Sequence, residues 1–298
     1  AHAAYPDKPI RLVVPWAAGG STDAVARAVA QRMTETMGQS VVVDNRTGAS
    51  GQIGTDAVAK SQPDGYTIGI VELPHAIAPA VFSKLPYDFL RDFAPVSMLG
   101  TSPLMLFVSA SHYKTGDIKG FLKNGRISTA PLPIANSGNG SISHLSGELL
   151  ANATDLKINA IPYRGSAPAL TDVASGLVAG HFSTLASGSS LLGAGKISAL
   201  MVTGSSRFAG LPDVPTAAEA GIPGMQFNQW WALVAPATTP IEIVQRLNKE
   251  VVSALTYPAT RERLTSLGIE LKGSTPEALR GFMRSEVEHW GDVVRKAG

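Results

Sequence analysis

Apolar residues near the N-terminus form a short continuous run and then recur at helical spacing. The run Ile10–Val14 predicts a buried strand. Over residues 25–37 the apolar positions recur every three or four residues, which predicts a helix. We expect Ser21 or Thr22 to cap the start of this helix and Gly38 to end it.

The same alternation continues after the first helix. Val41–Val43 predicts a second strand and Tyr66–Val71 a third, with a helix over Ile53–Lys60 between them. His75 is expected in a loop that follows the third strand. This order of strands and helices predicts a parallel sheet with helices on both faces.

A second block of the chain repeats the pattern. The turn Ser137–Ser141 follows a short strand and opens a helix with an apolar face. Further strands are expected at Leu104–Val108, Ile134–Asn136, Ile158–Tyr163, Val178–Ser183 and Ala199–Thr203. Two successive α/β blocks predict two lobes, and 298 residues are enough for two separate cores.

The C-terminal part indicates how the lobes are connected. Residues 210–224 are rich in Gly and Pro and suit a crossing between lobes. Gln229–Val234 predicts a strand, and we expect only helices after Pro240, packed back on the first lobe. The predicted domains are therefore residues 1–102 with 226–298 as lobe 1, and residues 103–225 as lobe 2.

Composition narrows the function classes. Charged residues make up 16% of the chain, the net charge is +2, and both signs are scattered, which argues against nucleic acid or a membrane surface as a partner. The chain has no cysteine, which excludes disulfides, thiolate catalysis and Cys-ligated metals. No apolar run approaches the ~20 residues of a membrane span. The start Ala1-x-Ala3 resembles the end of a signal peptide, so we expect an exported protein.

Two glycine-rich turns are the strongest candidates for a binding site. Gly19-Gly20-Ser21-Thr22 and Gly138-Asn139-Gly140-Ser141 each follow a predicted strand and precede a predicted helix. Glycine permits close approach of the backbone to a ligand, and the free N–H groups at a helix start carry partial positive charge. Together with small hydroxyl side chains, these features predict an anion site that needs no Lys or Arg.

Other chemistries lack their signatures. Neither glycine turn is followed by Lys-Ser or Lys-Thr, and no acidic residue ends the strand after the second turn, so nucleotide binding is not expected. No Gly-x-Ser-x-Gly sequence occurs, and Ser141 with His144 lacks the third member of a hydrolase site. His144 and Glu148 could share a metal, but no further ligand completes the set. We expect no metal, no cofactor and no catalytic residue.

Several aromatic and charged residues allow two interpretations. Trp16 precedes the first glycine turn and could either form a wall for a ligand or belong to the core. Trp230 and Trp231 alternate along a strand, so at most one of them can face a ligand. Asp23 and Arg27, four residues apart on the first helix, predict an ordinary surface ion pair.

The chain resembles the substrate-binding proteins of tripartite tricarboxylate transporters, also called the Bug family. The N-terminal motifs are Tyr5-Pro-x-Lys-Pro-Ile-Arg-Leu-Val-Val14, Pro15-Trp-Ala-Ala-Gly-Gly-Ser-Thr-Asp23, Asp44-Asn-Arg-x-Gly-Ala49, Pro63-Asp-Gly-Tyr-Thr67 and Arg91-Asp-Phe-Ala-Pro-Val96. Later motifs are Tyr163-Arg-Gly165, Ala167-Pro-Ala-Leu170, Leu211-Pro-Asp-Val-Pro-Thr216, Glu219-Ala-Gly221 and Leu247-Asn248. The resemblance spans nearly the whole chain in matched order.

The resemblance implies an α/β periplasmic binding protein fold, with two lobes joined by crossing strands and a ligand cleft between them. It also implies a periplasmic monomer that binds a small organic carboxylate and delivers it to membrane transporter subunits. By position, the residues that would bind the ligand are Trp16, Ala18, Gly19, Gly20, Ser21, Thr22, Asp23, His75, Ser137, Asn139, Gly140, Ser141, His144, Ser183 and Thr184.

Departures from the family pattern leave the ligand open. The family often has Asp at the positions of Ala179 and Ser183, so we interpret Ser183 and Thr184 as neutral donors that favour an extra ligand carboxylate over an amino group. An aliphatic dicarboxylate and an aromatic acid such as terephthalate both remain candidates. Two alternatives are an enzyme acting on a small carboxylate through His75, His144 or Asp23, and a sensory protein that presents the ligand to a receptor.

Overall fold

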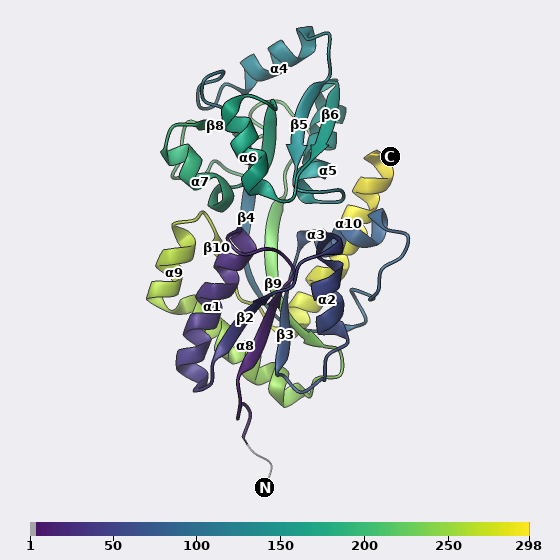
Figure 1. The fold of residues 1–298 in the computed structure, drawn as a ribbon, viewed down its shortest axis with the longest axis vertical. Coiled ribbons are helices and arrows are strands. Elements are labelled where there is room, and N and C mark those ends of the chain that lie inside the picture. The colour runs from purple at the N-terminus through teal and green to yellow at the C-terminus, as the bar shows by residue number, and fades with distance from the viewer. Residues whose placement is uncertain (1–3, 298) are drawn as a thin grey trace. The chain divides into compact units, whose positions relative to one another are not determined.

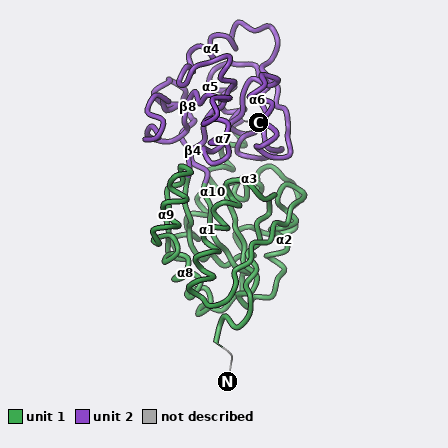
Figure 2. The backbone as a smooth tube through the Cα atoms, turned by 60° about the vertical axis from the view of Figure 1, so that its left-hand side comes forward, with its two compact units in different colours: residues 1–101, 230–295 green, residues 102–229, 296–298 purple. Residues whose placement is uncertain are grey.

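The computed structural model describes residues 4–297 (Figure 1); the small residues Ala1 and Ala3 of the expected export signal lie outside this range. The chain forms two compact units (Figure 2). Unit 1 contains the described residues up to Thr101 and Trp230–Arg295, and unit 2 contains Ser102–Gln229 with residues 296–297. No helix in the described range is both long and apolar enough to cross a membrane.

Unit 1 is built on a mixed sheet with the strand order β2-β1-β3-β9-β4, and β10 pairs with β4. The strands are β1 (Ile10–Val14), β2 (Val41–Asn45), β3 (Thr67–Glu72), β4 (Phe93–Ser109), β9 (Asn228–Pro236) and β10 (Glu270–Leu271). As predicted, β1 pairs in parallel with β2 and with β3. In contrast, β9 lies antiparallel to β3 and between β3 and β4.

Helices cover both faces of this sheet, as the alternating pattern predicts. The helices of unit 1 are α1 (Ser21–Met37), α2 (Gln52–Ala59), α3 (Leu73–Val81), α8 (Ile241–Thr256), α9 (Pro258–Thr265) and α10 (Pro276–Ala297), with a short 3₁₀ turn at Ala49–Gly51. Figure 1 shows α1, α8 and α9 on one side of the sheet and α2, α3 and α10 on the other. Neighbouring residues of β9 serve both sides, because Trp231 joins the core under α1 while Trp230 packs on Phe282 of α10.

Unit 2 is a smaller α/β layer structure. Its strands are β4, β5 (Leu132–Asn136), β6 (Ile158–Pro162), β7 (Gly180–Thr184) and β8 (Ile197–Val202). Its helices are α4 (Ile118–Ile127), α5 (Ile142–Thr154), α6 (Ser166–Ser175) and α7 (Leu185–Gly193). Because β5 is parallel to both β6 and β7, the carboxyl ends of these three strands lie at one edge of the sheet. Each of them leads directly toward the start of a helix.

Three local expectations are wrong. Residues after Pro240 are not all helical, since the short strand β10 pairs with β4. His75 lies inside α3 rather than in a loop, because Glu72 and His75 form a capping box that starts this helix. The turn-rich residues 210–224 remain inside unit 2, and the chain crosses between units at residues 101–102 and 229–230. The expected strand at Leu104–Val108 is confirmed, and it belongs to a longer, 17-residue strand, β4.

Candidate functional site

The first glycine turn joins β1 to α1 in unit 1. Gly20 is the N-cap of α1, and no side chain caps the helix, so the expected capping by Ser21 or Thr22 is wrong. Ala17, Ala18, Gly19 and Gly20 are exposed, and Ser21 is half-buried. The first backbone N–H groups of a helix have no acceptor within the helix. The turn therefore presents donors at the positive end of α1, which favours an anion.

The side chain of Asp23 stabilises the first glycine turn through hydrogen bonds. Its side chain accepts hydrogen bonds from Gly19 N (3.1 Å), Arg27 Nε (2.9 Å) and Asn45 Nδ2 (3.0 Å). The predicted ion pair between Asp23 and Arg27 is confirmed, but Asp23 is buried rather than at the surface. Burial opposes ionisation of Asp23, but the donors from Asn45, Arg27 and Gly19 outweigh it and lower the pKa below its ordinary value. Asp23 therefore stabilises the turn, and its oxygens are already occupied.

The side chains of Thr22 and His75 are both buried in unit 1. Thr22 is buried, and its hydroxyl accepts a hydrogen bond from Trp231 Nε1 (3.0 Å) and donates one to Glu72 Oε2 (2.5 Å). His75 Nδ1 accepts from Glu72 N (3.0 Å), so its Nε2–H can donate to Thr55 Oγ1 at 2.8 Å. Burial lowers the pKa of His75 to about 4 and keeps the ring neutral.

Trp16 lies between the interior and the first turn. It is half-buried, and its ring makes an edge-on contact with the His75 ring at 6.4 Å. A Cβ atom on Gly51 would come within 2.7 Å of the Trp16 ring, so glycine is needed for this close packing. The Trp16 indole nitrogen is buried without a hydrogen-bond partner. Part of the ring thus belongs to the core of unit 1, and part remains exposed beside the turn.

The second glycine turn joins β5 to α5 in unit 2. Ser141 caps α5, and its hydroxyl accepts from His144 N (3.2 Å). The Ser143 hydroxyl lies below the turn, where it accepts from Ser137 N (2.9 Å). Gly138 and Gly140 both have positive φ angles, a conformation that other residues rarely adopt. Asn139 is exposed, whereas Ser137, Gly140 and Ser141 are half-buried.

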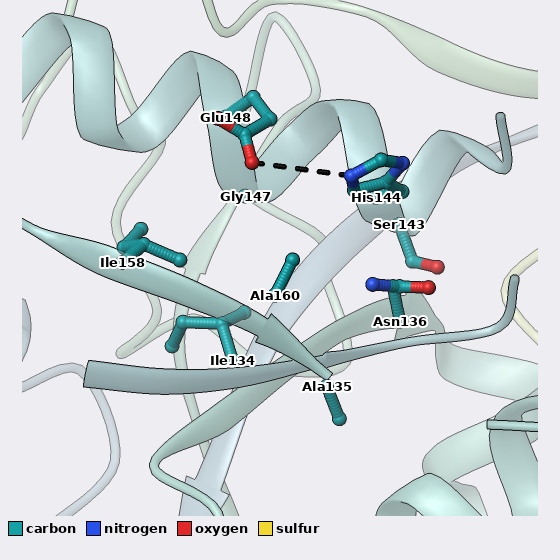
Figure 3. Close-up of a pocket in the computed structure, with 9 residues that line it drawn as sticks. All are labelled: Ile134, Ala135, Asn136, Ser143, His144, Gly147, Glu148, Ile158 and Ala160. Carbon is teal, nitrogen blue, oxygen red and sulfur yellow. Dashed lines mark ion pairs between the residues drawn. The ribbon is translucent and has the colours of Figure 1, made fainter. Parts of the chain in front are cut away.

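His144 and Glu148 border a small cavity against β5 and β6 (Figure 3). His144 Nδ1 accepts from Gly140 N at 3.4 Å, which directs its Nε2 toward Glu148 Oε1 at 3.9 Å. Asn136 lies across the cavity from this pair, with its amide nitrogen buried and without a partner, while its oxygen accepts from Gly138 N. No group of three metal-ligating side chains occurs in residues 4–297, so the His144–Glu148 pair is incomplete as a metal site.

A third helix start lies at the same edge of unit 2, and sequence reasoning did not find it. Gly165, with φ +113°, is the N-cap of α6, and the adjacent residue Arg164 is exposed. The Ser166 hydroxyl contacts His181 Nε2 (3.0 Å) and accepts a hydrogen bond from Ser183 (3.2 Å). The Tyr163-Arg-Gly165 motif was the available signal, because it follows a strand as the two glycine turns do.

The β7–α7 junction holds the last two expected ligand-binding residues. Thr184 is the N-cap of α7, and its hydroxyl lies 3.3 Å from that of Ser187. Both Ser183 and Thr184 are buried in this structure. Unit 2 therefore brings Ser137, Asn139, Gly140, Ser141, His144, Ser183 and Thr184 to one sheet edge. The first glycine turn lies in unit 1, where residues 17–20 are exposed.

Comparisons with known proteins identify similar sequences and structures. Residues 25–298 match the model of a family described as the tripartite tricarboxylate transporter family receptor. The periplasmic binding protein BugD is 34% identical, with a TM-score of 0.92 over 99% of both chains. MatC from Rhodopseudomonas palustris, solved with bound malate, is 35% identical, with a TM-score of 0.90 over 97% of this chain and 100% of that one.

A second R. palustris protein, solved with adipate, is 38% identical, with a TM-score of 0.93 over 99% of this chain and 98% of the other. These likenesses confirm the fold expected from the sequence. The two α/β units form a periplasmic binding protein fold.

Proposed function

Because this chain belongs to the family of tripartite tricarboxylate transporter receptors, we propose that it captures a small aliphatic dicarboxylate and delivers it to a membrane transporter. The observation that carries the proposal is the pair of glycine turns, one in each unit, at the starts of α1 and α5. Each offers backbone N–H groups and small hydroxyls in a conformation suited to an anion. Malate and adipate, the ligands of two similar proteins, are dicarboxylates.

The electrostatics of the turns favour carboxylates held by neutral donors. Arg27, the basic residue nearest in sequence to the first turn, is hydrogen-bonded to Asp23 and Asn45. A carboxylate that binds at either turn would lose its hydrogen bonds to water and gain hydrogen bonds from N–H and hydroxyl groups that are already oriented. Hydrogen bonds from such donors to an ionised group are strong. Arg164 lies on the neighbouring turn of unit 2 and is exposed.

Capture by two turns explains how binding would select one conformation. A ligand stabilises a closed arrangement of the units only when it binds that arrangement more tightly than the open one. A dicarboxylate does so when each of its ends engages one turn. A monocarboxylate of the same length would engage one turn and leave the other unoccupied. We therefore propose that two carboxylates are required for tight binding and for closure.

The Ser166–His181 pair at the start of α6 is a candidate for an enzymatic role. The distance of 3.0 Å suits a nucleophile and a base. However, burial lowers the pKa of His181 to about 4, and its Nδ1 faces the carbonyl oxygen of Ala135 rather than a carboxylate. Such an imidazole is a weak base near neutral pH. We therefore favour binding without turnover, with Ser166 as a hydrogen-bonding residue of the turn.

Calorimetric titration tests the proposal with matched ligands. Adipate and hexanoate have the same chain length, and hexanoate carries a methyl group in place of the second carboxylate. We expect adipate or malate to bind one per chain and hexanoate to bind at least about 100-fold more weakly, because a lost charge-assisted contact is worth about 3 kcal/mol. Terephthalate in the same series tests the aromatic alternative.

Two outcomes would contradict the proposal. Equal affinities for adipate and hexanoate would show that one carboxylate suffices. Conversion of the bound acid, followed by NMR of the ligand during incubation, would indicate an enzyme.

We further propose that the protein is exported and acts as a monomer in the periplasm, which is the compartment named for BugD. Fractionation of cells that make the protein from its natural gene checks this location.

A further inference from the structure

A buried hydrogen-bond chain lies directly below the first turn of α1. The indole N–H of Trp231 donates to Thr22 Oγ1 at 3.0 Å, and the Thr22 hydroxyl donates to Glu72 Oε2 at 2.5 Å. All three side chains are at least nine-tenths buried. A hydroxyl has one proton to donate, so this arrangement fixes its direction: Thr22 accepts from Trp231 and donates to Glu72.

The chain joins three separate elements of unit 1. Thr22 lies in the first turn of α1, Glu72 ends β3, and Trp231 lies on β9 opposite Glu72 in the strand register. The Glu72 carboxylate also accepts from the backbone N–H of His75 and so caps α3. One buried carboxylate therefore fixes the starts of two helices, α1 and α3.

We infer that Glu72 and Trp231 are positioning residues for ligand binding, acting through the Thr22 hydroxyl on the N–H donors of the first turn of α1. The inference deepens the proposed function and rests on it. The Thr22 side chain is buried and both hydrogen-bonding roles of its hydroxyl are occupied, so it has no group to offer a ligand. The backbone N–H groups of Ser21 and Thr22 belong to the same turn, and their direction follows the position of the Thr22 side chain. A donor displaced by a fraction of an ångström loses much of its hydrogen bond to a fixed carboxylate.

The test compares two threonines on the same helix. Thr34 also uses its hydroxyl twice, donating to Ala30 O (2.8 Å) and accepting from Val41 N (2.9 Å). It lies about 18 Å farther along α1, at 1.5 Å per residue, away from the turn. The variants Thr22→Val and Thr34→Val therefore remove the same chemical group and the same number of hydrogen bonds. Thr22→Ser keeps the hydroxyl and serves as the conservative rescue.

Adipate affinity by calorimetry and the melting temperature without ligand are measured for each variant. We expect Thr22→Val to weaken adipate binding by about tenfold, the loss of one well-placed hydrogen bond. Thr34→Val should lower the melting temperature less than Thr22→Val, because Thr34 is only half-buried, and should leave the affinity within about twofold of the wild type. Thr22→Ser should restore binding, and Trp231→Phe should weaken it less than Thr22→Val, because the bond from Thr22 to Glu72 remains.

The outcomes separate this inference from the proposed function. If the wild type binds adipate and Thr22→Val binds it equally well, the positioning role is wrong and the proposed function stands. The same holds if Thr34→Val loses as much affinity as Thr22→Val, since the effect then follows stability alone. If the wild type binds neither adipate nor malate, the proposed function itself is overturned.

Discussion

Replacing Asp23 with asparagine should destabilise the protein by about 2.5 kcal/mol. In the wild type, Oδ2 of Asp23 accepts from Arg27 Nε and Gly19 N, and Oδ1 accepts from Asn45 Nδ2. Asparagine has only one side-chain oxygen. At best, this oxygen keeps the bonds from Arg27 and Gly19, and the new NH₂ group then faces the NH₂ group of Asn45, so the third bond is lost because both groups are donors. One charged hydrogen bond is lost at about 1.5 kcal/mol, and two become neutral at a further cost of about 0.5 kcal/mol each.

Denaturant unfolding measures this loss against a control on the same helix. Glu35 pairs with Arg32 at 2.8 Å, but its side chain is 49% exposed. Glu35→Gln makes the same chemical change in an exposed pair and should cost less than about 0.5 kcal/mol. If Asp23→Asn costs no more than Glu35→Gln, the buried carboxylate does not hold the turn and our interpretation fails.

The pH dependence supplies a second check on Asp23. Its pKa in the folded protein is lower than the ordinary value of 3.8, so the folded state favours the ionised form. This stabilisation is fully present above the pKa of the unfolded chain and is lost as the pH falls through the folded-state pKa. The difference between wild type and Asp23→Asn should therefore shrink below about pH 4. A constant difference down to pH 2 would refute the ionic origin.

Three further predictions concern other parts of the molecule. Gly138→Ala should lose about 1–3 kcal/mol of unfolding free energy, because φ is +128°. Gly20→Ala, at φ −84°, carries no such strain and should lose less than about 1 kcal/mol, the cost of alanine at an N-cap; equal losses in denaturant unfolding would contradict the backbone argument. Ser183→Asp should raise the affinity for glutamate relative to glutarate at least tenfold in calorimetry, because a carboxylate would pair with the amino group; an unchanged ratio would refute this specificity. Burial raises the pKa of Glu286 despite the hydrogen bond from Trp230, so ionising it destabilises the folded state. Glu286→Gln should therefore gain stability relative to the wild type as the pH rises above 4.5, and parallel stability–pH curves would show that no such effect exists.

Local patterns predicted the elements that start the fold. The strand Ile10–Val14, the helix that follows it and the end of that helix at Gly38 are confirmed. These features depend on residues that are close together in the sequence. An apolar run, or a glycine directly after a helical pattern, can be recognised from the sequence alone. The helix α3 was missed because its N-cap is Glu72, which is not among the usual capping residues, and because Pro79 lies inside it.

In the candidate site, too, the sequence predicted features that depend on nearby residues and missed those that depend on distant ones. The two glycine turns could be found because each lies at a strand–helix junction. The inward direction of Thr22 could not, because its donor Trp231 is 209 residues away and its acceptor Glu72 is 50 residues away. The spacing of Asp23 and Arg27 correctly predicted their pairing but not the burial of Asp23, which depends on Asn45 of β2.

The position of β9 determines the order in which the protein can be assembled. β9 lies between β3 and β4, yet 118 residues separate the end of β4 at Ser109 from the start of β9 at Asn228. Until that segment has been made, β3 and β4 each expose an unpaired strand edge, which is a site for aggregation. Unit 2, apart from its last few residues, is continuous in sequence and can fold during this interval. Unit 1 must wait for the C-terminal part of the chain, so a nascent or truncated protein is expected to depend on chaperones.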